Sequence, residues 1–161
     1  MTANLSQFES TQPRAATLTV TRTRRKSRAS LKSSKSKDST RARAILVVDD
    51  VHDVTEMIEL FLRHAGYEVA TANSALTALE MARKRRFDMI ISDIGMPAMN
   101  GYELAAALRS LPNYQKVPMI AVTGYTEYDN RGRSLRAGFS AHLTKPIDPS
   151  HLLNLMNELL S

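Results

Sequence analysis

The chain has 161 residues and a formal net charge of +6, which allows one domain of ordinary size and a tail. It contains no cysteine, so disulfides, thiolate zinc sites and cysteine nucleophiles are excluded. No apolar run approaches the ~20 residues that cross a bilayer, so no transmembrane segment is expected, and the N-terminus shows no secretory signal.

The first 43 residues differ from the rest of the chain in charge. They carry eleven Lys or Arg against Glu9 and Asp38, a net charge of +9, whereas residues 44–161 have a net charge of −3. This basic segment is rich in Ser and Thr and poor in large apolar side chains, so residues 1–43 are predicted to be a disordered tail. Three interpretations stay open: a solvated extension, a docking segment for an anionic lipid, nucleic acid or acidic partner, and a targeting peptide.

From residue 44 onward, apolar runs typical of strands alternate with segments of helical periodicity. The expected strands are residues 44–48, 67–71, 87–92, 117–122 and 139–143. Apolar residues mark the helices after them: Val54, Met57, Ile58, Phe61 and Leu62; Leu76, Leu79 and Ala82; Leu104, Leu108 and Leu111; Leu152, Met156 and Leu159. A weaker helix is expected over 126–137, which holds Gly132. The alternation predicts an α/β domain of (βα)5 type over residues 44–161, with a parallel sheet and right-handed crossovers.

Polar residues follow four of these five strands. Asp49 and Asp50 close the first strand, Asp93 the third and Thr123 the fourth, and Lys145 follows the fifth. In an open parallel sheet, ligands bind outside the carboxyl ends of the strands. The five side chains are therefore predicted to converge on one crevice.

This set of side chains suits the transfer of a phosphoryl group. Three carboxylates within a few ångströms repel one another, so a cation has to compensate, and oxygen donors without His or Cys favour Mg²⁺ or Mn²⁺. Asp93 beside such an ion can attack phosphorus and form an acyl phosphate, with Lys145 supplying a second positive charge and Thr123 a hydroxyl. Taken alone, each residue has a simpler explanation, such as a turn or helix cap for an aspartate. The step from Lys145 to Pro146 forms a tight turn that would suit a cis peptide bond.

Four motifs resemble the receiver domain of two-component response regulators. They are Ile45-Leu46-Val47-Val48-Asp49-Asp50, Asp93-Ile94-Gly95-Met96-Pro97 followed by Asn100-Gly101, Val122-Thr123-Gly124, and Thr144-Lys145-Pro146. The resemblance spans residues 44–161. Within it, the run from Ala141 to Pro146 is similar to the receivers of hybrid kinases. The resemblance implies a flavodoxin-like, doubly wound sheet with the strand order 2-1-3-4-5.

The resemblance also implies an acceptor and a metal site. Asp93 looks like the phosphoacceptor. Asp50, Asp93 and the backbone carbonyl of Gly95 look like ligands of the metal ion, and Asp49 would act on it through water. Uptake and loss of the phosphoryl group on Asp93 would be the protein's only chemistry, so it is expected to be a signalling protein rather than an enzyme.

The remaining implied roles concern the phosphoryl group and the switch. Lys145 would pair with the phosphoryl oxygens, and Thr123 would move toward them on activation. Gly124 would keep that approach open, and Tyr125 would shield the acyl phosphate from water. His142 stands where many receivers carry Tyr or Phe, so it is either part of the switch or a half-buried strand histidine.

These implications describe a phosphorylation-activated switch in a cytoplasmic two-component phosphorelay. A histidine kinase or histidine phosphotransfer protein would donate the phosphoryl group, and the surface of the fourth helix, fifth strand and fifth helix would change. That surface carries Arg131, Arg133 and Arg136, which are either solvated or face an acidic partner. The sequence shows no DNA-binding domain, so output through an unknown downstream protein is expected.

Two other functions fit parts of the pattern. A phosphatase of the haloacid dehalogenase type needs an Asp-x-Asp motif after the first strand, and Val51 occupies the place of the second aspartate. A flavodoxin-like electron carrier needs a phosphate-binding loop there, and Asp49 and Asp50 would repel the FMN phosphate. The phosphatase alternative would also place the nucleophile on the first strand and leave Asp93 without a role.

Overall fold

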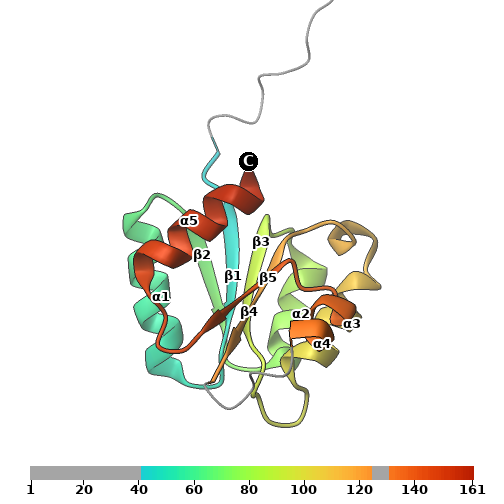
Figure 1. The fold of residues 1–161 in the computed structure, drawn as a ribbon. Coiled ribbons are helices and arrows are strands. Elements are labelled where there is room, and N and C mark those ends of the chain that lie inside the picture. The colour runs from blue at the N-terminus through green and yellow to red at the C-terminus, as the bar shows by residue number, and fades with distance from the viewer. Residues whose placement is uncertain (1–40, 125–130) are drawn as a thin grey trace, which may run out of the picture. The chain divides into compact units, whose positions relative to one another are not determined.

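The computed structural model describes residues 41–124 and 131–161. Its strands form one parallel sheet in the order β2-β1-β3-β4-β5 (Figure 1), which confirms the predicted flavodoxin-like fold. The strands are β1 (Ala44–Val48), β2 (Glu68–Ala72), β3 (Met89–Asp93), β4 (Met119–Thr123) and β5 (Ala141–Thr144). The helices are α1 (His52–His64), α2 (Ala75–Lys84), α3 (Gly101–Arg109), the 3-10 helix η1 (Pro112–Tyr114), α4 (Arg131–Ala137) and α5 (Pro149–Leu160).

Helices cover both faces of the sheet. Figure 1 shows α1 and α5 on one face and α2, α3 and α4 on the other. Successive residues of β1 point to opposite faces, so Ile45 and Val47 join the core under α1 and α5, whereas Leu46 and Val48 join the core under α2 and α3. This division explains why the inner strands β1, β3 and β4 read as largely apolar runs.

Side-chain caps fix where several helices begin. Ser74 accepts a hydrogen bond from the backbone N–H of Thr77 at the start of α2. Asn100 and Glu103 form a reciprocal capping box at the start of α3. Asp148 caps α5, whose first residue is a proline. These caps set the directions in which the chain leaves the carboxyl ends of the strands.

Several expected details are wrong. Met57 and Leu76, which were expected on buried helix faces, are 55% and 58% exposed. The buried stripe of α1 is occupied by Ile58 and Leu62, four residues apart, and Met57 lies beside that stripe. Leu111 lies beyond the end of α3 and precedes η1, which was not expected. The first strand has the expected bounds, whereas the boundaries of the other four strands differ from the expected ones by one or two residues.

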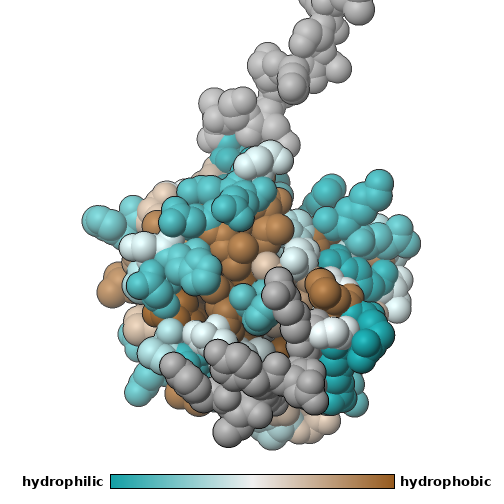
Figure 2. Space-filling model, in the orientation of Figure 1, coloured by the Kyte–Doolittle hydropathy of each residue, from teal (hydrophilic) through white to brown (hydrophobic). Residues whose placement is uncertain are grey.

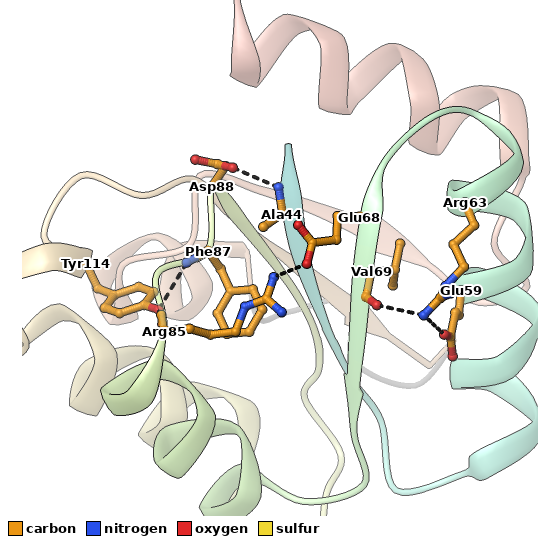
Figure 3. A network of polar contacts seen from close by, with 9 residues as sticks. All are labelled: Ala44, Glu59, Arg63, Glu68, Val69, Arg85, Phe87, Asp88 and Tyr114. Atoms are coloured by element: carbon orange, nitrogen blue, oxygen red, sulfur yellow. Dashed lines mark hydrogen bonds and ion pairs between the residues drawn. The ribbon is translucent and has the colours of Figure 1, made fainter. Parts of the chain in front are cut away.

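The amino edge of the sheet, at the top of Figure 1, is tied together by polar contacts. The Tyr114 hydroxyl donates to the carbonyl of Arg85 at 2.8 Å, and burial raises the pKa of this hydroxyl. The Asp88 carboxylate accepts from the backbone N–H of Ala44 at 2.7 Å, and the Arg85 guanidinium pairs with Glu68 at 2.8 Å (Figure 3). No helix in the described ranges has the length and apolar content needed to span a membrane.

Candidate functional site

Two buried carboxylates lie together at the carboxyl edge of the sheet. The parallel register pairs Val48 with Ser92, so the next residues, Asp49 and Asp93, lie at the same level of neighbouring strands. Their exposed fractions are only 2% and 6%. The ammonium nitrogen of Lys145 lies 2.8 Å from Asp49 Oδ2 and 2.7 Å from Asp93 Oδ1. One cation therefore bridges both carboxylates and offsets only one of their two negative charges.

The turn after β5 places this lysine. The bond between Lys145 and Pro146 is cis, as the sequence predicted. The backbone N–H of Lys145 donates to the carbonyl of Thr123 at 2.7 Å, which ties the turn to the end of β4. Asp49 is fixed in a similar way, because its second oxygen accepts from the N–H of Val51 at 2.9 Å. Backbone contacts thus hold both partners of the ion pair.

The other predicted residues surround this pair. Thr123 is buried and ends the strand next to Asp93. Asp50 is exposed at the mouth of the site, and the backbone N–H of Gly95 donates to the Asp93 carboxylate. Gly124 is exposed, and no atom of the described residues lies within 4 Å of its Cβ position. The structure does not describe Tyr125, so the predicted shielding role lies outside the described residues.

Burial dominates the electrostatics of the site. It raises the pKa of the Asp93 carboxyl, and the hydrogen bond and charge of Lys145 only partly counter this effect, while Asp49 adds to it. Burial lowers the pKa of Lys145, but the hydrogen bonds and charges of both aspartates outweigh it and leave that pKa raised. The site therefore has a buried carboxylate that would gain from a further positive charge.

We expect Asp93 to make the protein more stable as the pH falls from neutrality. Its folded-state pKa is raised above that of the unfolded chain, so between these two values the folded state binds more protons. The free energy of unfolding then rises as the pH falls through the raised pKa. Urea titrations of the wild type and Asp93→Asn between about pH 7 and pH 4 should show the wild type gaining stability relative to the variant. A constant difference would contradict this expectation.

The donor set fits a hard divalent cation, although not as a compact trio. No group of three His, Cys, Asp or Glu side chains is arranged for a metal within residues 41–124 and 131–161. Asp49 and Asp93 pair with Lys145, and Asp50 is exposed. Mg²⁺ needs only one or two carboxylates, with waters completing its shell. Asp50, Asp93 and the backbone of Gly95, whose Cβ position is 3.4 Å from Asp93 Oδ2, supply oxygen donors of that kind.

Gly101 is a feature that the sequence interpretation missed. A Cβ atom on this residue would lie 2.4 Å from the carbonyl oxygen of Asp93 and 2.8 Å from Cα of Ile94. The N–H of Gly101 also donates to the carbonyl of Ile94 at 3.0 Å. The start of α3 therefore packs directly on the backbone that carries Asp93. The pair Asn100-Gly101 was the available signal, but it gave no information about this contact.

Helix α4 contacts α3 through an aromatic ring. The Arg133 guanidinium lies 4.5 Å from the ring centroid of Tyr102, and the Tyr102 ring meets Phe139 edge-on at 6.4 Å. The buried Tyr102 hydroxyl has no hydrogen-bond partner among the described residues. Of the three arginines predicted on this surface, Arg133 thus has a contact within the protein, Arg136 is exposed, and the side chain of Arg131 is not described.

His142 lies half-buried on β5. Strand β4 separates β5 from β3, which carries Asp93. His142 lines a hollow of about 210 Å³ together with Leu135 of α4 and Leu155 of α5. Figure 2 shows apolar residues gathered in the middle of the face that carries α5 and β5, bordered by polar side chains. In the sheet, His142 pairs with Ala121 of β4.

Sequence comparisons connect the site to known proteins. The model of the family described as "Response regulator receiver domain" matches residues 45–157. An uncharacterized 14.6 kDa protein of Leptolyngbya boryana is 38% identical over 114 residues, covering 71% of this chain and 87% of that protein. The transcriptional regulatory protein PrrA of Mycobacterium tuberculosis is 38% identical over 116 residues, covering 72% of this chain. The match covers 49% of PrrA, so this chain corresponds to about half of that relative.

Solved structures give the same result. The chemotaxis response regulator CheY4 of Vibrio cholerae is 36% identical with a TM-score of 0.71, covering 74% of this chain and all of that one. The receiver domain of a sensor histidine kinase from Pseudomonas aeruginosa is 29% identical with a TM-score of 0.69, covering 74% and 98%. In that structure a magnesium ion is coordinated in the active site cleft. None of these similarities points to a haloacid dehalogenase phosphatase or a flavin-binding electron carrier.

Proposed function

The chain belongs to the response regulator receiver family, the phosphoryl-accepting switches of two-component systems, and from this membership we propose that Asp93 is its phosphoacceptor. The observation that carries the proposal is the position of Asp93. It is a buried carboxylate at the end of β3, with the ammonium of Lys145 at 2.7 Å and an exposed carboxylate, Asp50, at the mouth of the site.

The transfer itself asks little of the protein beyond positioning and charge. An oxygen of the Asp93 carboxylate attacks the phosphorus of a phosphohistidine, and the phosphorus–nitrogen bond breaks with its electron pair returning to the imidazole. Lys145 moves its hydrogen bond from the carboxylate to a phosphoryl oxygen, while Asp49 keeps the lysine in place. A bound Mg²⁺ or Mn²⁺, held by Asp50, Asp93 and the carbonyl of Gly95 with Asp49 acting through water, would neutralise the other phosphoryl oxygens.

Activation then follows from the new charge at the site. Phosphorylation adds acceptor oxygens beside the buried hydroxyl of Thr123, which favours a conformation in which this hydroxyl approaches them. Thr123 ends β4, and His142 lies on the adjoining β5. A shift of Thr123 would therefore change the packing around His142 and the surface formed by α4, β5 and α5. Gly124 has room to accommodate the movement.

Receiver domains interact with histidine kinases or histidine phosphotransfer proteins, and we place this chain downstream of one of them, in the cytoplasm. Its own phosphorylation and dephosphorylation would be its only reactions. The downstream partner would contact the α4, β5 and α5 surface, where Arg136 and the apolar hollow beside His142 are accessible. We also propose that the receiver domain comprises residues 44–161 and that residues 1–43 form a basic tail outside it.

A small phosphodonor tests this proposal without the cognate kinase. With acetyl phosphate and Mg²⁺, the full chain should take up one phosphoryl group, and chelation of the metal should lower the rate by at least about tenfold. Hydroxylamine should release the bound phosphoryl group, which serves as the label in this experiment. It cleaves acyl phosphates but not the phosphoesters that the Ser- and Thr-rich tail would form. Label that resists hydroxylamine, or uptake that is independent of the metal, would contradict the proposed chemistry.

A further inference from the structure

Three adjoining hollows lie at the amino edge of the sheet, opposite Asp93. Their volumes are about 520, 280 and 470 Å³. Arg43 lines all three, Arg86 lines the first two, and Arg41 lines the last two. Because they share these residues, we treat them as one surface, the amino-edge groove, which also includes Lys116 and Leu160.

The amino-edge groove is strongly cationic. Its four cations, Arg41, Arg43, Arg86 and Lys116, are all exposed, and the only carboxylate side chain in its lining is Asp88. One Asp88 oxygen already accepts from a backbone N–H, as Figure 3 shows. None of the four cations forms an ion pair within the part of the chain that the structure describes. Arg41 and Arg43 belong to the basic segment 1–43, whereas Arg86 and Lys116 belong to residues 44–161, whose net charge is −3.

The groove also has an apolar side. Leu159 and Leu160 of α5 are half-buried in its wall, and Pro112 is exposed beside them. Its aromatic side chains are Phe87, which is fully buried, and Tyr67, which is half-buried and packs against the core under α1 and α5. Stacking of nucleobases, on which single-stranded nucleic acid binding depends, is therefore not favoured. A hollowed surface with its leucines in the wall is also poorly shaped for insertion into a membrane.

We propose that the amino-edge groove binds an acidic polypeptide segment that carries apolar side chains between its carboxylates. Arg43 and Arg86 would pair with the carboxylates, for which the guanidinium fork is well suited, and Leu160 would contact an apolar side chain. The basic segment 1–43 strengthens the charge complementarity, because two of its arginines, Arg41 and Arg43, belong to the groove. Excess positive charge would speed the encounter, and the groove would supply the specific contacts.

The test uses the unphosphorylated full chain without Mg²⁺, so that its outcome is independent of the acceptor chemistry. The probe is a short fluorescent peptide of alternating Glu and Leu, and binding is followed by fluorescence anisotropy. The double variant Arg43→Glu/Arg86→Glu should bind it at least about tenfold more weakly. The matched control is Arg83→Glu/Lys84→Glu, which makes the same change in net charge at exposed residues outside the groove and should lose less than about twofold.

Three outcomes would overturn the proposal. Equal losses in both double variants would mean that only the total charge attracts the peptide. Equal binding of a Glu-Ser peptide of the same charge would remove the apolar contact. Tighter binding of a short RNA, or of anionic vesicles, through the same two arginines would assign the groove to another partner. If Arg43→Glu/Arg86→Glu does not fold, Arg43→Gln/Arg86→Gln replaces it, with a smaller loss expected and no loss contradicting the proposal.

Discussion

An Asp93→Asn variant should take up no phosphoryl group from acetyl phosphate in the presence of Mg²⁺. The amide that replaces the carboxylate is not a nucleophile toward phosphorus, and neither Asp49 nor Asp50 has the position of Asp93 at the end of β3. The variant should still fold. Burial raises the pKa of Asp93, so replacing the ionised group with a neutral one of the same size removes a desolvation cost at pH 7. Loss of uptake with an unchanged or higher Tm is the expected combination.

The control for this experiment is Asp53→Asn. Asp53 is an exposed carboxylate in the first turn of α1, close in sequence to the acidic pair, and it makes no contact with Lys145. The rate of phosphoryl uptake by Asp53→Asn should stay within about twofold of the wild-type rate, since a single exposed charge has little effect on the site or on stability. Uptake by Asp93→Asn at the wild-type rate would refute the assignment of the acceptor. Label found on Asp49 or Asp50 of the wild type would assign the acceptor to another carboxylate.

The positions of the site residues could be predicted because they follow from local sequence. Strands β1, β3 and β4 are buried along their whole length, so each reads as a largely apolar run, and the residue that ends the run marks the carboxyl edge. Asp93 and Thr123 were placed in this way, and the structure puts them on neighbouring strands. The direct ion pair between Lys145 and Asp49 was not predicted, since the spacing of strand ends gives a shared edge but no distances.

Features that depend on several loops at once were beyond the sequence. Arg109 is the clearest case, because its guanidinium donates to the carbonyls of Tyr114, Val117 and Gly138. Its position at the end of α3 gives no indication that two other loops approach it there. The amino-edge groove has the same origin, because Arg43 precedes β1, Arg86 lies between α2 and β3, and Lys116 lies between η1 and β4. Such sites are set by the approach of distant segments rather than by periodicity.

A Gly101→Ala variant should lose both stability and phosphoryl uptake. The added Cβ would lie 2.4 Å from the carbonyl oxygen of Asp93 and 2.8 Å from Cα of Ile94, and neither backbone atom can move without displacing the end of β3. Overpacking of this kind typically costs about 1–3 kcal/mol. Because the displaced segment carries Asp93, we expect slower uptake from acetyl phosphate even at temperatures where the variant is folded.

The comparison variant is Gly132→Ala. Gly132 lies in α4, and the atom nearest its Cβ position is the end of the flexible Arg136 side chain at 3.3 Å, which can move aside. Replacing this glycine, in the first described turn of α4, with alanine should then be neutral or stabilise by up to about 1 kcal/mol. Urea unfolding measures the effect of each substitution on stability, and the initial rate of phosphoryl uptake measures its effect on the position of Asp93. If Gly101→Ala unfolds at the same urea concentration as the wild type and takes up the phosphoryl group at the wild-type rate, the close approach of α3 to β3 does not hold Asp93 in place. If stability falls while uptake by the folded protein is unchanged, the contact supports the fold alone.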